Sequence, residues 1–312
     1  MTMLLVRNAG SLPAGRTRLC IERTGKTVLH QRQRQLLARL GDLTDLPSLP
    51  NVASDLIWKL NDPDTGIADV TGPLSQDPAL AGQMLKMVNS AYYGVRQEVT
   101  SLSQAITLLG YRTVQTVVLS AAAKGVFRLR CKSPRFDQEA MTLHSIAAAA
   151  VARHLARTSR KVNPDLAFSV GLLHDIGKLA IDQVAPDHYT TLFDDAKEQE
   201  TDLLAAEKST GSCGHCVAAA QLGDHWRLPS DIVDGIGHHH TMASAENADM
   251  TAVMLITDYI CQMKQLGAPD NFSEPQLDRE AWSAVGIPST ELAPMLSGVD
   301  EHIAQAREIF AL

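Results

Sequence analysis

The stretch AFSVGLLHDIGKLA, residues 167–180, carries a histidine and an aspartate, His174 and Asp175, inside an otherwise apolar run. Apolar residues on every side predict a buried helix, which we expect to span Asp165 to Ala180. A buried carboxylate costs several kcal/mol unless a cation compensates it, and a divalent metal ion bound by both side chains would do so. The alternative is that the pair faces solvent at a helix end just before Gly177.

Further histidines and a second buried-looking carboxylate extend this pattern along the chain. Seven of the eleven histidines lie within 67 residues, where an even spread would place about two. The added candidate ligands lie in or at the ends of four predicted helices, with His239 and His240 at the end of the same one: His144, His215, His239, His240 and Asp258. Each one alone is more often a core or surface residue, and Asp258, in the run AVMLITDYIC, could pair with an arginine. Together they form the kind of set that holds one or two transition-metal ions.

The composition predicts an all-α globular protein. Of the 312 residues, 45% are hydrophobic and 20% charged, which excludes a globally disordered or low-complexity chain. Aromatic residues, at 4%, are too scarce for a typical all-β protein, and long tracts of Ala, Leu, Val and Met favour helices. We find no alternating strand pattern of useful length and no internal repeat.

The net charge and the cysteine content limit which partners and which cellular location the sequence predicts. A formal net charge of −7 predicts no nucleic-acid partner and no attraction to an anionic membrane. No apolar run approaches the ~18–20 residues of a membrane span, and the first residues lack the basic leader of a signal peptide. Five scattered cysteines, an odd number, do not predict a disulfide framework. We therefore expect a cytoplasmic location.

Capping residues and apolar spacing predict a series of helices separated by short connections. Asn51 is a candidate N-cap, and Asp77-Pro78 and Gly110 are candidate boundaries between helices. The main predicted helices span residues 30–40, 51–60, 80–88, 103–109, 114–127, 137–158, 165–180, 194–208, 214–226, 230–239, 247–266 and 299–311, with one more short helix before Asp77.

We consider two local motifs as signs of other functions. Cys213-Gly214-His215-Cys216 is a CxxC sequence of the kind found in thiol oxidoreductases, but its predicted helical surroundings differ from the usual strand-to-helix junction. If His215 joined those cysteines on a zinc ion, the histidine constellation would lose a ligand. Gly171 to Gly177 has neither Walker nor dinucleotide-binding spacing, so P-loop chemistry is not supported.

The order H…HD…H…HH…D resembles the metal-binding signature of HD-domain phosphohydrolases. It falls on His144, His174-Asp175, His215, His239-His240 and Asp258. Lys178, in HDxGK, also matches the active-site pattern of that superfamily, in which a lysine can meet the substrate phosphate. The resemblance implies two divalent transition-metal ions that activate a water for in-line attack on phosphorus, with Asp175 and Lys178 as catalytic residues. Mixed His/Asp ligation does not discriminate between iron, manganese, zinc and nickel.

A more specific resemblance covers residues 41–265. The segments LPSLPNVASDLIWKLNDPDTG, LSQDPALAGQMLKMVNSAYYG, GLLHDIGKLAI and GDHWRLPSDIVDGIGHHH are similar to those of the HDOD family. This resemblance implies an N-terminal helical lobe (41–130) packed against an HD-like lobe (131–265). Residues 1–40 then form a lead-in with a short helix, and 266–312 a C-terminal helical extension. HDOD domains occur in bacterial signalling proteins, often beside response-regulator or cyclic-dinucleotide domains.

The match departs from the cyclic-di-GMP phosphodiesterases at two places. After the paired histidines the chain reads HHHTMASAEN, without the Gly-Tyr-Pro signature, and Ala140 stands where some of those enzymes place a third-metal glutamate. We therefore expect a signal-transduction module that retains a metal site and acts through a protein partner. The alternative is an active metal-dependent phosphohydrolase acting on a nucleotide or another phosphoester.

Overall fold

The computed structural model describes residues 38, 49–90, 92–210, 214–267 and 270–310, and every regular element within these ranges is a helix. The only β contact among them is an isolated bridge between Asp202 and Asn271. The all-α prediction is confirmed; the helix expected at 30–40 falls almost wholly outside the described residues. The helices are α3 Asn51–Lys59, α4 Ile67–Ser75, α5 Pro78–Val88, α6 Leu102–Val126, α7 Gln138–Ser159, α8 Pro164–Leu173, α9 Ile176–Val184, α10 Pro186–Glu198, α11 Leu203–Thr210, α12 His215–His225, α13 Ser230–Gly237, η2 Met242–Ser244, α14 Ala248–Met263, α15 Arg279–Val285, η3 Ser289–Glu291 and α16 Leu292–Phe310.

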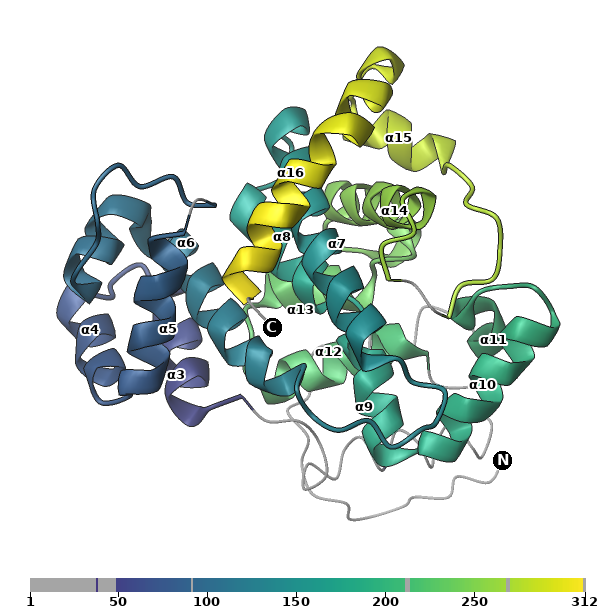
Figure 1. The fold of residues 1–312 in the computed structure, drawn as a ribbon, viewed down its shortest axis with the longest axis horizontal. Coiled ribbons are helices and arrows are strands. Elements are labelled where there is room, and N and C mark those ends of the chain that lie inside the picture. The colour runs from purple at the N-terminus through teal and green to yellow at the C-terminus, as the bar shows by residue number, and fades with distance from the viewer. Residues whose placement is uncertain (1–37, 39–48, 91, 211–213, 268–269, 311–312) are drawn as a thin grey trace, which may run out of the picture.

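Helices α3, α4 and α5 gather against α6 at one end of the molecule (Figure 1). Asp77 caps α5 as the sequence predicts, since its carboxylate accepts from the Leu80 N–H at 3.0 Å. The predicted boundary at Gly110 is a sharp bend within α6, where φ is 76° and ψ is 164°. Only glycine adopts that φ without steric cost, so the two halves of α6 run in different directions.

Helix α7 is the central element of the rest of the molecule. It packs along α8 and also contacts α14 and α16 (Figure 1). Its alanine run, Ala147–Ala150, is buried. A side chain at Gly171 on α8 would come within 2.7 Å of the Ala148 carbonyl oxygen, so glycine permits the close approach of α7 and α8. These two helices carry three of the predicted metal ligands at or near their ends.

A buried arginine joins the two groups of helices. The Arg153 guanidinium, on α7, lies 4.8 Å from the centre of the Tyr92 ring and 5.4 Å from that of Tyr93, both from the connection after α5. Its Nη2 atom forms an ion pair at 2.9 Å with Asp165 Oδ1 at the start of α8. Ring faces attract cations, and this attraction strengthens when water is excluded.

Three predicted helices differ from the structure. The helix expected at 165–180 is broken into α8 and α9 at His174-Asp175. There the His174 Nδ1–H donates to the Gly171 carbonyl at 2.9 Å. In an uninterrupted helix that carbonyl would accept from the backbone N–H of Asp175, four residues further on. The helix expected at 194–208 is divided between α10 and α11 by a turn with Glu200 at φ 52°. The helix expected at 299–311 begins earlier, at Leu292, because Pro294 falls in the first turn, where no backbone N–H is required. No helix in the described ranges combines the length and apolar character that crossing a bilayer demands.

Candidate metal centre

All seven predicted ligands come together in the interior, from five parts of the fold. His144 projects from α7, the His174-Asp175 pair from the α8–α9 break, and Asp258 from α14. His215 begins α12, and His239-His240 follow the end of α13. His174 is 0% exposed and Asp175 is 3% exposed, which overturns the alternative that the pair faces solvent.

A glycine in the HDxGK motif permits this convergence. A side chain at Gly177 on α9 would collide with the backbone of His215 and of Ala219 on α12. The close approach of α9 and α12 places Asp175 beside His215, with Oδ1 3.5 Å from the imidazole Nε2. The glycine therefore has a packing function that holds two parts of the centre together.

The candidate ligands form two clusters, within each of which all the offered ligand atoms lie within 4.8 Å of one another. The carboxylate cluster comprises His144, His174 and Asp258, and the thiol cluster comprises His215, Cys216, His239 and His240. In the carboxylate cluster the two Nε2 atoms lie 3.3 Å apart. In the thiol cluster the His215 and His239 Nε2 atoms lie 3.2 Å apart.

Asp175 lies between the two clusters and turns one carboxylate oxygen toward each. Oδ2 is 3.5 Å from His144 Nε2 and 3.4 Å from His174 Nε2, in the carboxylate cluster. Oδ1 is 3.5 Å from His215 Nε2 and 3.8 Å from His239 Nε2, in the thiol cluster. A carboxylate in this position can bridge two metal ions.

The outer nitrogen of each facing imidazole is fixed by an acceptor. The Nδ1–H groups of His144, His174 and His239 donate to the carbonyls of Leu266, Gly171 and Ile236, at 3.2, 2.9 and 2.7 Å. His215 Nδ1–H donates to a Glu207 carboxylate oxygen at 2.9 Å. Because carbonyl and carboxylate oxygens can only accept, Nδ1 carries the proton and Nε2 offers its lone pair inward, the usual arrangement of metal-binding histidines.

Facing lone pairs repel unless a proton or a metal ion lies between them, and the pKa values reflect this. Burial lowers the pKa of His174, but Asp175 and Asp258 outweigh it, so the pKa is raised. Burial and the neighbouring His174 lower the pKa of its partner His144. In the other pair, burial lowers the His215 pKa, but Cys216 and Glu207 raise it well above its usual value.

Asp258 supplies the direct test of whether the residues fit a metal. Its Oδ1 atom is buried and has no hydrogen-bond partner among the described residues, although His174 Nε2 lies 3.5 Å away. Burial raises the pKa of this carboxyl. The sequence had allowed an ion pair between Asp258 and an arginine, but no arginine pairs with it in the described part of the chain. An unpartnered buried oxygen beside inward-facing nitrogens is the donor set of a transition-metal ion.

Lys178 lies at the edge of the centre, held by two carboxylates. Its Nζ atom is 2.8 Å from Asp175 Oδ2 and 3.0 Å from Asp270 Oδ2. Burial lowers the pKa of Lys178, but Asp175 and Asp270 outweigh it and raise the pKa well above its usual value. The ammonium group is therefore charged and already paired on two sides.

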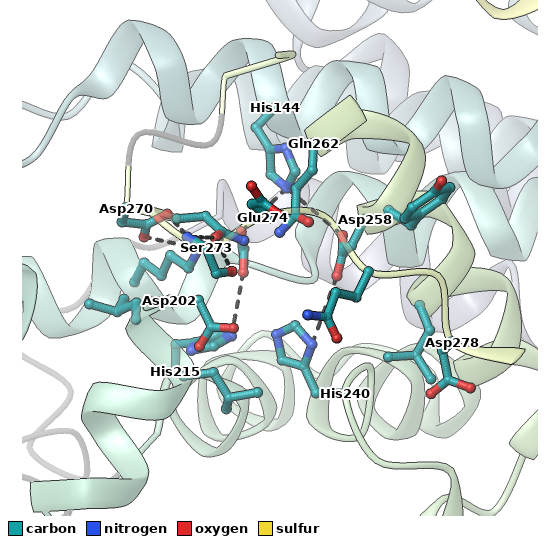
Figure 2. Close-up of a pocket in the computed structure, with 18 residues that line it drawn as sticks. His144, Asp202, His215, His240, Asp258, Gln262, Asp270, Ser273, Glu274 and Asp278 are labelled. Atoms are coloured by element: carbon teal, nitrogen blue, oxygen red, sulfur yellow. Dashed lines mark hydrogen bonds and ion pairs between the residues drawn. The ribbon is translucent and has the colours of Figure 1, made fainter. Parts of the chain in front are cut away.

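A cavity of about 390 Å³ opens onto this arrangement. Figure 2 shows the His144 and His240 rings pointing into it from opposite sides, with Asp258 between them and the segment of Ser273 and Glu274 crossing the front. Among the described residues that line it, Lys178 is the only lysine or arginine. The carboxylates that line it are Asp175, Asp202, Asp258, Asp270, Glu274 and Asp278.

Three residues at the centre were not predicted for these positions. Glu207 fixes His215, Asp270 holds Lys178, and Cys216 joins the thiol cluster. Cys216 was visible only as part of the CxxC sequence; its partner Cys213 lies outside the described residues, while His215 lies with the other histidines. Nothing in the local sequence marks Glu207 or Asp270, because both act through contacts with residues far along the chain or on another helix.

Comparison with known proteins identifies relatives of similar architecture. A family model described as the HDOD domain matches residues 46–242. The crystal structure of an HDOD domain protein of unknown function from Geobacter sulfurreducens superposes with a TM-score of 0.74 at 23% identity, covering 90% of this chain and 99% of that one. A protein of Shewanella amazonensis SB2B, provisionally named a phosphohydrolase, gives 0.67 at 23% identity, covering 91% and 98%.

Two further similarities are more partial. A protein of Marinobacter aquaeolei VT8, provisionally named a signal transduction protein, gives a TM-score of 0.68 at 21% identity, covering 92% of this chain and 66% of that one. An uncharacterized protein of Treponema pallidum (strain Nichols) is 25% identical over 213 residues, 68% of this chain. The match spans only 41% of that protein's length. At these identities the solved structures show the shared fold.

Proposed function

The chain belongs to the HDOD domain family, and we propose that it is a bacterial signal-transduction module whose HD-type site binds a pair of divalent transition-metal ions. The observation that carries the metal site is the position of Asp175, with one oxygen facing the Nε2 atoms of each cluster. The names of two structural relatives, one for signal transduction and one for phosphohydrolase activity, support a module of this kind.

The ligand assignment follows from the two clusters. His144, His174 and Asp258 would hold one ion, and His215, His239 and His240 the other, with Asp175 shared between them. Iron, manganese, zinc and nickel all suit imidazole and carboxylate ligands. The HDOD domain itself would extend over residues 41–265, slightly beyond the 46–242 that the family model matches.

The side chains around the cavity favour signalling over hydrolysis. Six carboxylates and one ammonium group line it, and that ammonium group is already held by Asp175 and Asp270. Apart from the bound ions, a phosphoester would therefore meet no unpaired cation from the described lining. Bound ions would change the charge and the packing at the α8–α9 break, which a protein partner could read.

Elemental analysis of protein purified without an affinity tag tests the metal site. We expect two transition-metal ions per chain in the wild type and loss of the ion in the carboxylate cluster in His174→Ala. The matched control is His154→Ala, since His154 lies on α7 but stacks on His302, outside the clusters. Wild-type protein that takes up no metal after incubation with iron, manganese and zinc would refute the proposal.

The second candidate function is a metal-dependent phosphohydrolase, favoured by the open cavity at the clusters. When bound, two such ions polarise a phosphoryl oxygen and lower the pKa of a bound water. Lys178 would stay oriented by Asp270 and stabilise charge on a phosphoryl oxygen. Release of p-nitrophenolate from bis(p-nitrophenyl) phosphate that His174→Ala abolishes and His154→Ala keeps would favour the enzyme. Metal-loaded protein that leaves a broad phosphoester panel intact would favour the module.

A further inference from the structure

Cys216 is the one sulfur ligand within reach of the histidines among the described residues. It is the second residue of α12, directly after His215. Its Sγ atom lies 3.7 Å from His215 Nε2 and 3.9 Å from His239 Nε2. The His240 imidazole offers a further nitrogen within the same 4.8 Å cluster. The sulfur thus lies where a ligand beside the three imidazoles and the shared Asp175 carboxylate would lie.

Thiolate is the form of cysteine that binds metals. Cys131 provides a contrast within the same chain. It lies outside both clusters, and burial, with Asp182 nearby, raises the pKa of its thiol to about 12.

We propose that the Cys216 thiolate is a ligand of the ion in the thiol cluster. The inference rests on the proposed metal site and specifies its chemistry. One position would be formed by sulfur and imidazole and the other by imidazole and the Asp258 carboxylate. Thiolate and imidazole favour zinc or iron, whereas carboxylate-rich positions also suit manganese, so the two positions would select different ions.

Cobalt(II) is the probe, because a thiolate bound to it gives a charge-transfer absorption band in the near ultraviolet. Titrating metal-free full-length protein with cobalt should produce this band together with the visible bands of bound cobalt. Cys216→Ser should lose the charge-transfer band while keeping cobalt in the carboxylate cluster. Affinity in the thiol cluster should fall by more than the roughly 10–100-fold that loss of an outer hydrogen-bond partner costs. Cys131→Ser should keep both features.

The outcomes separate this inference from the proposed metal site. Visible cobalt bands in the wild type without a charge-transfer band would overturn the role of Cys216 and leave the metal site standing. No cobalt binding at all would overturn both. A charge-transfer band that survives in Cys216→Ser but disappears in Cys213→Ser would assign the sulfur to the other cysteine and overturn the inference.

Alkylation of the unmutated protein gives a second test that does not depend on folding of a variant. Iodoacetamide labelling is measured by mass spectrometry of the peptides that contain Cys216 and Cys131. Zinc should slow labelling of Cys216, because the thiolate that reacts is also the form that binds the metal, and should leave Cys131 unchanged. Equal labelling rates with and without zinc, at zinc concentrations that load the protein, would overturn the inference.

Discussion

Replacing Asp175 with asparagine should remove most of the stabilisation that metal ions give the fold. The amide keeps one oxygen and exchanges the other for an NH₂ group, which cannot ligate. Because the two carboxylate oxygens face different clusters, asparagine can serve only one of them. The variant also leaves Lys178 with Asp270 as its remaining carboxylate partner.

The magnitude follows from linkage between binding and unfolding. An ion at about 100 times its Kd stabilises the folded state by about 2.7 kcal/mol, so two ions contribute about 5 kcal/mol. At about 2–4 °C per kcal/mol for domains of 150–250 residues, and less for a longer chain, the wild type should gain roughly 10 °C in Tm. Asp175→Asn should gain less than half of that shift.

The assay is differential scanning calorimetry with and without zinc or manganese, and Asp234→Asn is the matched control. Asp234 is a buried carboxylate on α13 that accepts from His238 and from the N–H groups of Glu246 and Asn247. It lies outside both clusters, so its variant should be less stable without metal but keep the full metal-induced shift. An Asp175→Asn protein that shows the wild-type shift would refute the bridging role.

Three further predictions concern packing and charge. Gly177→Ala should cost roughly 1–3 kcal/mol in urea unfolding and lower metal content, because a methyl group there overpacks α9 against α12. Gly125→Ala, where the added methyl meets open space on α6, should instead stabilise by about 0.5–1 kcal/mol; equal effects would contradict this assignment. Burial raises the Asp234 pKa, but its hydrogen bonds outweigh this and lower it below 3.8. Asp234→Asn should therefore lower the free energy of unfolding by about 1–3 kcal/mol at neutral pH. Because only ionised Asp234 contributes, this difference from the wild type should disappear as the pH falls through the lowered pKa. A difference in stability that persists in acid would refute this. Arg153→Met should cost roughly 3 kcal/mol in free energy of unfolding, because it leaves the Asp165 carboxylate without its ion-pair partner. Arg157→Met, one turn along α7 and exposed, should change the urea midpoint little. Matching losses in the two variants would show that the buried charge is not the cause.

Short-range signals in the sequence predicted the helical class and most helix positions. Asp77 caps its helix as predicted, because a carboxylate needs only the N–H groups of the next turn. The prediction of Asn51 as an N-cap was wrong: Pro50 holds that position, Asn51 is the first residue of α3, and no side chain caps the helix. The ligand set could also be predicted, because histidines and aspartates in apolar helices imply a shared interior partner. Their convergence is observed, while metal binding itself stays a prediction.

Features that depend on side chains far apart could not be predicted in the same way. At the break, the His174 ring donates to the Gly171 carbonyl, a contact that the apolar periodicity does not reveal. Glu207 and Asp270 look like ordinary solvent-facing acids in the sequence, and only the folded chain brings them to His215 and Lys178. The cytoplasmic location, the protein partner and the domain limits also stay predictions.

The short helix α8 has a mechanical consequence for the molecule. Its first turn carries Asp165, which forms an ion pair with Arg153 where the two groups of helices meet. The same carboxylate accepts a hydrogen bond from Thr113 Oγ1 at 2.8 Å. His174 follows its last turn, so about 15 Å of helix separates the junction from the candidate metal ligands. An α-helix of that length is stiff, and Gly171 seats it tightly against α7. A displacement of His174 would therefore move α8 as a rigid body. The movement would reach Asp165 and its contacts where the two groups of helices meet.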